Sequence, residues 1–422
     1  MRRRSGWRWL ALAAFWSILT GCAPVPFRHP PPTLSIPPEI PRGRVEAQIQ
    51  TLPSAPPDVP TAATDPFPPA IYRALTAAEV QRLAAIHAPG ARLHEMEASW
   101  SKPHPAGKSP TTPARELRRA ILLHTSRELQ NRAAGAALEA YYRLAEAEGQ
   151  TDLLEETITQ LETAIAETRD MLEQQLKPPV DVEVWLRQLH QSQGDRLKAQ
   201  LSIEELNSRL RRMLGLTACS ERERIWNPEH YAVNDEPIDM GAAIGIALHH
   251  RPDLILLRLV IASLSPQTLG LIREQLQATY PLLADKPSGP MSELFAPLLT
   301  MLPAGRTEIE LRRGQLIDWL REREAAVVEE VRQAVTAIRY HGRVAALAWQ
   351  RERSHLQALQ EAHSRRQQGL ASFAELAQKH LEWLKARSDV LQETMAWYIA
   401  RVRLWQAQGL LAPTCVPPIA NR

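Results

Sequence analysis

The sequence predicts an all-α protein made of two tandem copies of a long antiparallel coiled-coil hairpin. Three observations support this fold class. Apolar residues repeat with heptad spacing, proline and glycine interrupt that pattern at the ends of long segments, and landmarks recur at an offset of 194 residues. A heptad seam packs one long helix against another. Its recurrence at a fixed offset indicates that two hairpins share one architecture.

The first 21 residues are typical of an export signal. Arginines at positions 2, 3, 4 and 8 precede an apolar stretch from Leu10 to Leu19, and small residues follow it. The apolar stretch is about half the length that spans a bilayer. The tetrad Leu19-Thr20-Gly21-Cys22 resembles the lipobox of bacterial lipoproteins, which implies cleavage before Cys22 and lipidation of its thiol. Ala23, in place of aspartate, favours the outer membrane by the same resemblance. An ordinary signal with a chance cysteine is the alternative.

Residues 22–70 are predicted to be a linker that begins with the lipidated cysteine. Residues 23–70 carry 15 of the 34 prolines, so this stretch cannot form a helix and has little to pack. Proline-rich segments of this kind are extended, semi-rigid spacers. We therefore expect the folded body to begin near residue 71.

A first helical hairpin is predicted between residues 115 and 216. Its leading arm carries a heptad seam, which runs through Leu154, Ile158, Leu161, Ile165, Thr168 and Leu172. The break at Lys177-Pro178-Pro179 ends this arm, because proline lacks a donor and clashes with the previous turn. A second helix is expected from Asp181 to Leu214, where Gly215 ends it.

The chain then repeats itself with an offset of 194 residues. Three pairs of segments share this offset without a gap: Glu116–Arg119 with Glu310–Arg313, Gln174-x-Leu176 with Gln368-x-Leu370, and Gly215-Leu216 with Gly409-Leu410. The second hairpin therefore covers residues 309–410. A shorter helix is expected in front of each hairpin, at about 77–97 and 240–264. These boundaries predict one repeat at 71–218, a second at 219–412 and a tail at 413–422.

These landmarks resemble the TolC-like outer-membrane efflux proteins. Residues 242–254, AAIGIALHHRPDL, look like the family's "A…AL..RPDL" helix. The hairpins end in Gly-Leu pairs, and the turn Gln368-Gly369-Leu370, followed by Phe373-x-Glu375-Leu376, looks like the family's hairpin tip. The tandem duplication is itself a family property, and the resemblance covers roughly residues 72–412.

The resemblance implies a homotrimer that forms a hollow helical cylinder across the periplasm, with a β-barrel in the outer membrane. Periplasmic adaptors and inner-membrane pumps dock on the hairpin tips. Carried over to this sequence, the adaptor contacts fall on Gln368, Gly369 and Leu370 of one tip, and on Lys177, Pro178 and Pro179 of the other. Gly369 has a second interpretation, as a turn glycine that supplies a positive φ. Because Gln175 stands at the matching place, the two tips should not bind adaptors equally.

The sequence departs from the family where β-hairpins supply the membrane barrel. A spanning strand needs about 9–11 residues of alternating character. The first insertion point, 100–113, has 14 residues and four prolines. The second insertion point, 265–306, does not alternate between apolar and polar residues, and its residues 269–283 suggest a helix. We therefore expect the β-hairpins to be absent or vestigial, which would make the lipid on Cys22 the only membrane attachment.

Composition and motifs point away from catalysis. The net charge of +3 does not suggest nucleic acid as a partner. His94-Glu95 lacks the second histidine of a zinc-protease motif, and the adjacent His249 and His250 point to different helix faces. No phosphate-binding loop or nucleophile motif is present. We expect no catalytic residue, no metal site, no cofactor and no enzyme activity.

Several side chains have two interpretations. Cys219 and Cys415 would form a disulfide in an oxidising compartment or remain two unpaired thiols. The tryptophans of the second hairpin would line a ligand path or fill space between helices. Arg312-Arg313 and Arg365-Arg366 would face anionic lipid or a partner, or form a solvated helix surface.

Two functions follow from these features. The first is a transport component: a lipid-anchored, outer-membrane-associated efflux protein that faces the periplasm and forms a trimeric helical conduit. The second is a structural or interaction scaffold that keeps the hairpins, has no lumen and is tethered to the membrane. The missing strands motivate the second. A ligand-binding lipoprotein would need a concave polar pocket, for which the sequence offers no candidate.

Overall fold

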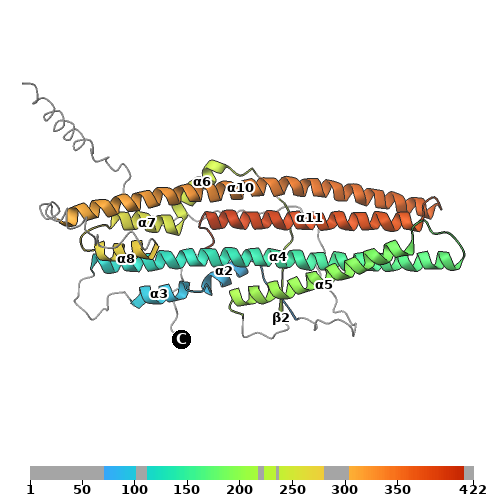
Figure 1. Cartoon of the computed structure of the whole chain (residues 1–422), viewed down its shortest axis with the longest axis horizontal. Helices are drawn as coiled ribbons and strands as arrows, with labels where there is room; N and C mark the ends of the chain where they lie inside the picture. The colour runs from blue at the N-terminus through green and yellow to red at the C-terminus, as the bar shows by residue number, and fades with distance from the viewer. Residues whose placement is uncertain (1–70, 101–111, 217–222, 234–236, 280–303, 413–422) are drawn as a thin grey trace, which may run out of the picture. The chain divides into compact units, whose positions relative to one another are not determined.

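The computed structural model describes residues 71–100, 112–216, 223–233, 237–279 and 304–412, which belong to one compact unit, Ala47–Arg422 (Figure 1). Within these residues there are nine α-helices and two short strands. In the first half they are β1 (Ile71–Ala74), α2 (Ala77–Ile86), α3 (Ala91–Trp100), α4 (Pro113–Glu173), α5 (Val182–Met213) and β2 (Glu223–Trp226). In the second half they are α6 (Met240–His250), α7 (Pro252–Ala262), α8 (Leu269–Thr279), α10 (Ala304–Gln367) and α11 (Phe373–Ala407).

The prediction of an all-α fold with two long helical hairpins is confirmed. α4 has 61 residues and α10 has 64, so each runs about 90 Å at the usual helical rise. α5 packs back along α4, and α11 packs back along α10. α4 and α10 end at Glu173 and Gln367, 194 positions apart, which is the offset of the sequence repeat.

The two hairpins lie side by side in the order α10, α11, α4, α5 (Figure 1). The contact between them is made by α11 and α4, which leaves α5 and α10 at the two edges. The short helices in front of the hairpins continue this row, because α7 packs between α10 and α4 while α2 and α3 pack on α4. Along its length, α4 is therefore accompanied first by α5 and then by α2 and α3, and α10 first by α11 and then by α7.

The two predicted front helices are each divided in two. The first breaks between α2 and α3, where Pro89 and Gly90 follow one another and Gly90 has a φ of 80°. The second breaks at Arg251, which is the extended residue before Pro252. A residue before proline avoids the helical region, and proline is well suited to the first turn of the next helix. The prediction of one continuous helix in each place was therefore wrong at its proline.

Glycine ends both hairpins for two reasons. Gly215 and Gly409 have φ values of 70° and 74°, a left-handed conformation that glycine adopts without penalty. Each glycine also lies close to the break in the front helix of the same repeat. A methyl group built on Gly215 would lie 2.6 Å from His87 Nδ1, and one on Gly409 would lie 3.0 Å from Arg251 Cα. The Gly-Leu pairs therefore mark the places where each front helix meets the end of its hairpin.

β1 and β2 form one parallel pair, in which Ile71 lies opposite Glu223 and Ala74 opposite Trp226. The pair joins the chain before the first hairpin to the chain after it. It covers a core cluster that contains Tyr141 and Tyr142 of α4, Ile225 of β2 and Met395 of α11. Both repeats therefore contribute to one core.

The described part of the second insertion point is helical, as predicted. α8 packs with the starts of α4 and α10 around Leu117, Ile272 and Leu316. Residues 101–111 and 280–303 lie outside the described residues, so the prediction for those segments is not tested. The same holds for Cys22, the proline-rich linker, Cys219 and Cys415. Among the described helices, none combines the length and the apolar character needed to cross a membrane.

Candidate functional site

The predicted tip residues occupy the two turns that connect the arms of the hairpins. Lys177, Pro178 and Pro179 lie between α4 and α5, and Gln368, Gly369 and Leu370 lie between α10 and α11. Figure 1 places both turns at the same end of the helical row. An ion pair between Arg366 of α10 and Glu167 of α4, at 3.7 Å, connects the two hairpins there. The structure thus brings the six residues to one end of the molecule.

Both turns close by the same backbone motif. In the first, Gln175 has a φ of 58°, and the Leu176 amide donates to the Met171 carbonyl at 2.8 Å. In the second, Gly369 has a φ of 73°, and the Leu370 amide donates to the Arg365 carbonyl at 2.8 Å. These 6→1 bonds satisfy carbonyls that the end of a helix leaves open. The turn-glycine interpretation of Gly369 is therefore supported.

A leucine follows the left-handed residue at each tip and points to solvent. Leu176 is 51% exposed and Leu370 is 66% exposed. A methyl group built on Gly369 would meet no heavy atom within 4 Å, so the second turn is open on that side. An apolar side chain held out on a rigid turn is suited to insertion between the side chains of a partner.

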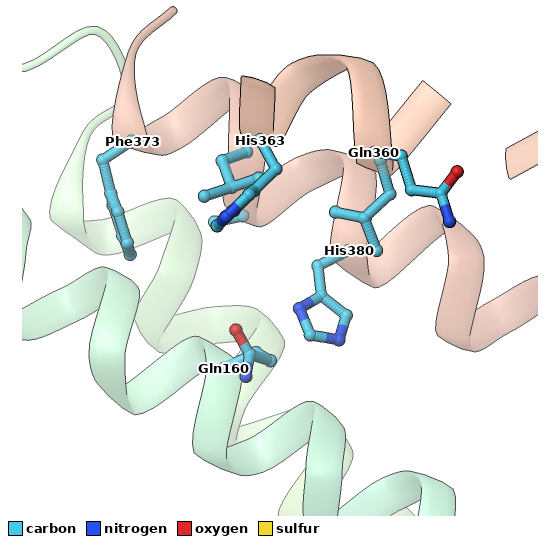
Figure 2. A pocket seen from close by; sticks show the side chains of 8 residues that line it. Gln160, Gln360, His363, Phe373 and His380 are labelled. Atoms are coloured by element: carbon cyan, nitrogen blue, oxygen red, sulfur yellow. The ribbon is translucent and has the colours of Figure 1, made fainter. Parts of the chain in front are cut away.

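A hollow of about 400 Å³ lies beside the second tip, between α4, α10 and α11. Figure 2 shows Gln160 of α4 on one wall and Gln360, His363, Phe373 and His380 around the others. His380 Nε2 lies 3.2 Å from a Glu156 carboxylate oxygen, and the Arg366 guanidinium stacks over the Phe373 ring at 4.8 Å. The hollow is open and its surface is mainly apolar with polar groups at its walls, which suits a protein side chain better than an enclosed small molecule.

The hydrogen-bonding groups around the second tip are largely engaged. The Arg365 side chain donates to the Glu375 carboxylate at 2.8 Å. The Glu375 backbone amide donates to the Ser372 hydroxyl at 3.1 Å, which caps the start of α11. Farther from the tip, Arg387 and His380 of α11 both reach Glu156 of α4. These contacts order the turn and hold α11 against α4, so the tip presents a preformed surface.

No known protein-family model matches this chain, and no curated protein matches its sequence. Solved structures do match. They include CusC, described as a transmembrane channel (14% identity, TM-score 0.56, 79% of this chain and 91% of that chain). The open state of the Neisseria gonorrhoeae MtrE outer-membrane channel matches at 11% identity and a TM-score of 0.56, over 81% and 91% of the two chains. The outer-membrane protein VceC of Vibrio cholerae matches at 14% identity and a TM-score of 0.52, over 79% and 96%.

This chain has a TolC-like fold. The identities of 11–14% establish the fold alone. The resemblance seen in the sequence is thereby confirmed at the level of architecture, from the duplicated hairpin to the front helices.

In this TolC-like fold the RPDL motif is a buried ionic joint, a role that the sequence did not reveal. The Arg251 side chain is 6% exposed and donates to both Asp253 oxygens, at 3.0 and 3.2 Å. It also pairs with Glu330 of α10 and donates to the Ala407 carbonyl at the end of α11. Arg323 joins Asp253 and Glu330 from the other side, at 2.7 and 3.2 Å. In the sequence, an arginine next to a helix-breaking proline was the feature that could have indicated this role.

The remaining basic and aromatic residues divide between packing and ion pairs. Trp397 is buried in a core cluster, and the Trp383 indole donates to Glu352 at 2.7 Å, so both join helices. The interpretation of Arg312 as a lipid-facing, partner-facing or solvated residue was wrong. Its side chain is buried and pairs with Glu308 at 3.7 Å, a carboxylate that Arg273 of α8 also pairs with. Arg313 is exposed.

The residues considered for metal chemistry have structural partners. Glu95 accepts hydrogen bonds from Ser126 and Gln130 and thereby fastens α3 to α4. His249 Nδ1 lies 2.8 Å from the Gly245 carbonyl, one turn earlier in its own helix. Within the part of the chain that the structure describes, no three His, Cys, Asp or Glu side chains gather as a metal site would require.

Proposed function

We propose that this protein is an outer-membrane-associated lipoprotein of the TolC-like type, anchored through Cys22 and facing the periplasm. Three copies assemble into a helical conduit that serves efflux. Its hairpin tips dock with a periplasmic adaptor and, through it, with an inner-membrane pump. The fold supports this proposal, and the two open edges of the helical row are the observation that carries it.

The edges of the row carry apolar side chains that the single chain leaves in solvent. At the α5 edge, Leu197 and Leu201 are exposed, and at the α10 edge, Tyr340 and Leu347 are exposed. The two patches lie at comparable distances from the tips. Leu201 is about 29 Å along α5 from its first residue, and Leu347 is about 30 Å along α10 from its last, at the usual rise per residue.

At the end of the row away from the tips, the two edges again carry exposed apolar side chains. There α3 replaces α5 at the edge, and its face opposite α4 bears Leu93, Met96 and Trp100, all exposed. At the α10 edge, Leu311 is exposed; it corresponds to Leu117 of the first repeat, 194 residues earlier. Joining the α3–α5 edge of one copy to the α10 edge of the next buries both sets. This contact is head-to-tail, so its repetition closes a ring of three copies when the rotation between neighbouring copies is one third of a turn.

The tips provide the second part of the proposal. Leu176 and Leu370 are exposed on rigid turns, and the hollow beside Phe373 and His380 lies next to the second one. A helical adaptor tip would place its own side chains between them. The open Gly369 turn allows a close approach of a partner backbone, whereas the first turn carries Gln175 and two prolines. We therefore assign the stronger contact to the second tip.

The assembly is tested by the mass of the detergent-solubilised protein and its conductance in a planar bilayer. The wild type is expected to have the mass of three chains and to carry current. Leu201→Lys or Leu347→Lys should raise the dissociation constant of the assembly about tenfold or more, because each leucine would be buried at the joint.

The control for these variants is Leu172→Lys. Leu172 is 48% exposed, close to the 50% of Leu347, but it lies on α4 inside the row and not at an edge. It should leave the trimer mass unchanged. A wild-type monomer or dimer without conductance would overturn the conduit and favour the scaffold function.

The lipid anchor makes a separate prediction. Cys22→Ala should leave the folded body intact, with an unchanged far-ultraviolet circular dichroism spectrum, and should release it in soluble form from washed membranes. The physical reason is that stable attachment requires the acyl chains that this thiol would carry. Fractionation followed by immunoblotting measures it. A variant that stays in the membrane fraction would show that another part of the chain holds the bilayer.

A further inference from the structure

The β1–β2 pair forms a joint with α4 and α5. The Asn207 side chain of α5 clamps β2 by donating to the Glu223 carbonyl at 3.1 Å and accepting from the Ile225 amide at 3.0 Å. The Tyr141 hydroxyl of α4 donates to the Leu75 carbonyl at 2.6 Å, directly after β1. This joint fixes the start of the first front helix and the end of the first hairpin.

One carboxyl group is enclosed in this joint without a full set of partners. Glu148 lies on α4, two turns after Tyr141, and its Oε1 atom is buried with no hydrogen-bond partner among the described residues. The next residue, Gly149, is covered by Leu391 of α11, whose Cδ2 would lie 2.7 Å from a methyl group built there. A buried carboxylate that lacks donors is costly, whereas a neutral carboxyl group is tolerated.

The charges around Glu148 do not compensate it. Arg224 of β2 is the cation that acts on it, but this guanidinium already pairs with Glu204 of α5 and hydrogen bonds with Tyr72 of β1. Asp152, one turn farther along α4, adds negative charge.

The other charged groups of the joint are paired with one another. On the strands, Arg73 pairs with Glu223 at 3.5 Å, and on the hairpin, Arg196 of α5 pairs with Glu155 of α4 at 3.6 Å. An ionised Glu148 would therefore compete for a cation that two other side chains share.

We propose that Glu148 is a proton-sensitive latch of this joint. While its carboxyl group is neutral, the β1–β2 pair stays seated on α4. When it ionises, the unpaired charge pushes the strands and the end of α5 away from α4. The latch belongs to the fold of a single chain, so it does not depend on the proposed transport function.

The direction of the effect follows from the surroundings of the carboxyl group. Burial, reinforced by Asp152 and opposed by Arg224, raises the pKa of Glu148 from 4.5 to about 8. A raised carboxyl pKa means that the closed joint holds the proton more tightly than the opened one. The closed state is therefore favoured most below pH 4.5 and loses this advantage as the pH rises towards 8.

Hydrogen exchange of the full-length protein in detergent tests the latch. Peptides that cover residues 71–75 and 223–226 are followed from pH 5 to pH 9, with rates corrected for the intrinsic pH dependence of exchange. In the wild type, the opening constant should rise by up to about tenfold for each pH unit between the two pKa values. Glu148→Gln keeps the shape and the neutral state, so its opening constant should stay flat above about pH 6, the pKa to which burial raises Asp152.

Glu162→Gln serves as the matched control, since Glu162 lies on the same helix and is exposed. In the Glu162→Gln protein, the β1–β2 joint should open with the same pH dependence as in the wild type. Peptides from the α10–α11 core, such as those around Val331, should show no such rise in any variant. A Glu148→Gln protein with the wild-type pH dependence would overturn the proposal, as would a wild type whose opening does not change with pH.

Discussion

Replacement of Arg251 by alanine is expected to lower the free energy of unfolding by about 3 kcal/mol, at the lower end of the range for breaking a buried ion pair. The substitution leaves Asp253 and Glu330 with Arg323 as their shared cation, and removes the donor to the Ala407 carbonyl. The lower end applies because Glu330 is partly exposed and keeps some hydration. Urea unfolding, followed by circular dichroism at 222 nm, measures the change.

Arg321→Ala is the control for Arg251. Arg321 also lies in an arginine–carboxylate pair, with Asp318 at 3.4 Å, but both side chains are more than 70% exposed. Exposed pairs contribute little, so the change should stay within about 0.5 kcal/mol. Equal losses in the two variants would show that the burial of Arg251 has no energetic weight and that the RPDL joint is misassigned.

Gly409→Ala is expected to cost about 2–5 kcal/mol. About 1–2 kcal/mol of this comes from holding alanine in a left-handed conformation, and about 1–3 kcal/mol comes from overpacking. The added methyl group would lie 3.0 Å from both Arg251 Cα and Pro252 Cδ, and 3.1 Å from the His250 carbonyl oxygen. Because two of these atoms belong to the backbone and the third belongs to a proline ring, none of them can turn aside.

Gly369→Ala separates the two contributions. Gly369 has nearly the same φ, 73° against 74°, but no heavy atom lies within 4 Å of the added methyl group. Its cost should therefore be the conformational part alone, about 1–2 kcal/mol. The difference between the two midpoints of thermal unfolding reports the close approach of the front helix. Equal costs would contradict the packing of Arg251 and Pro252 against Gly409.

The sequence predicted the long elements well because its signals there are local and repeated. The heptad from Leu154 to Leu172, the prolines after Lys177 and the offset of 194 residues each specify a helix or its end without reference to the rest of the fold. The front helices were less well predicted, because the choice between a kink and a break at Pro89 or Pro252 depends on what packs beside it.

The two hairpin turns were predicted in position, but their contacts were not. The tip residues follow from the turn signals, whereas the hollow at Phe373 and His380 needs α4, which is more than 200 residues away in the chain. Arg251 and Arg312 show the same limit. Sequence alone identifies an arginine on a helix, but its burial depends on Glu330 in one case and on α8 in the other. Contacts distant in sequence leave no periodic trace.

The order of the helical row has a consequence for biosynthesis. α11 follows the other described helices in the chain, yet its place is in the interior of the row, between α10 and α4. Until α11 is made, Tyr142 and Asn131 of α4 lack the partners that its end of the chain supplies. Asn131 bonds to Gln406 and Leu411, and Tyr142 stacks on Tyr398. A chain in which α11 is not yet made therefore leaves part of this face of α4 uncovered, and exposed surface of this kind promotes aggregation during folding.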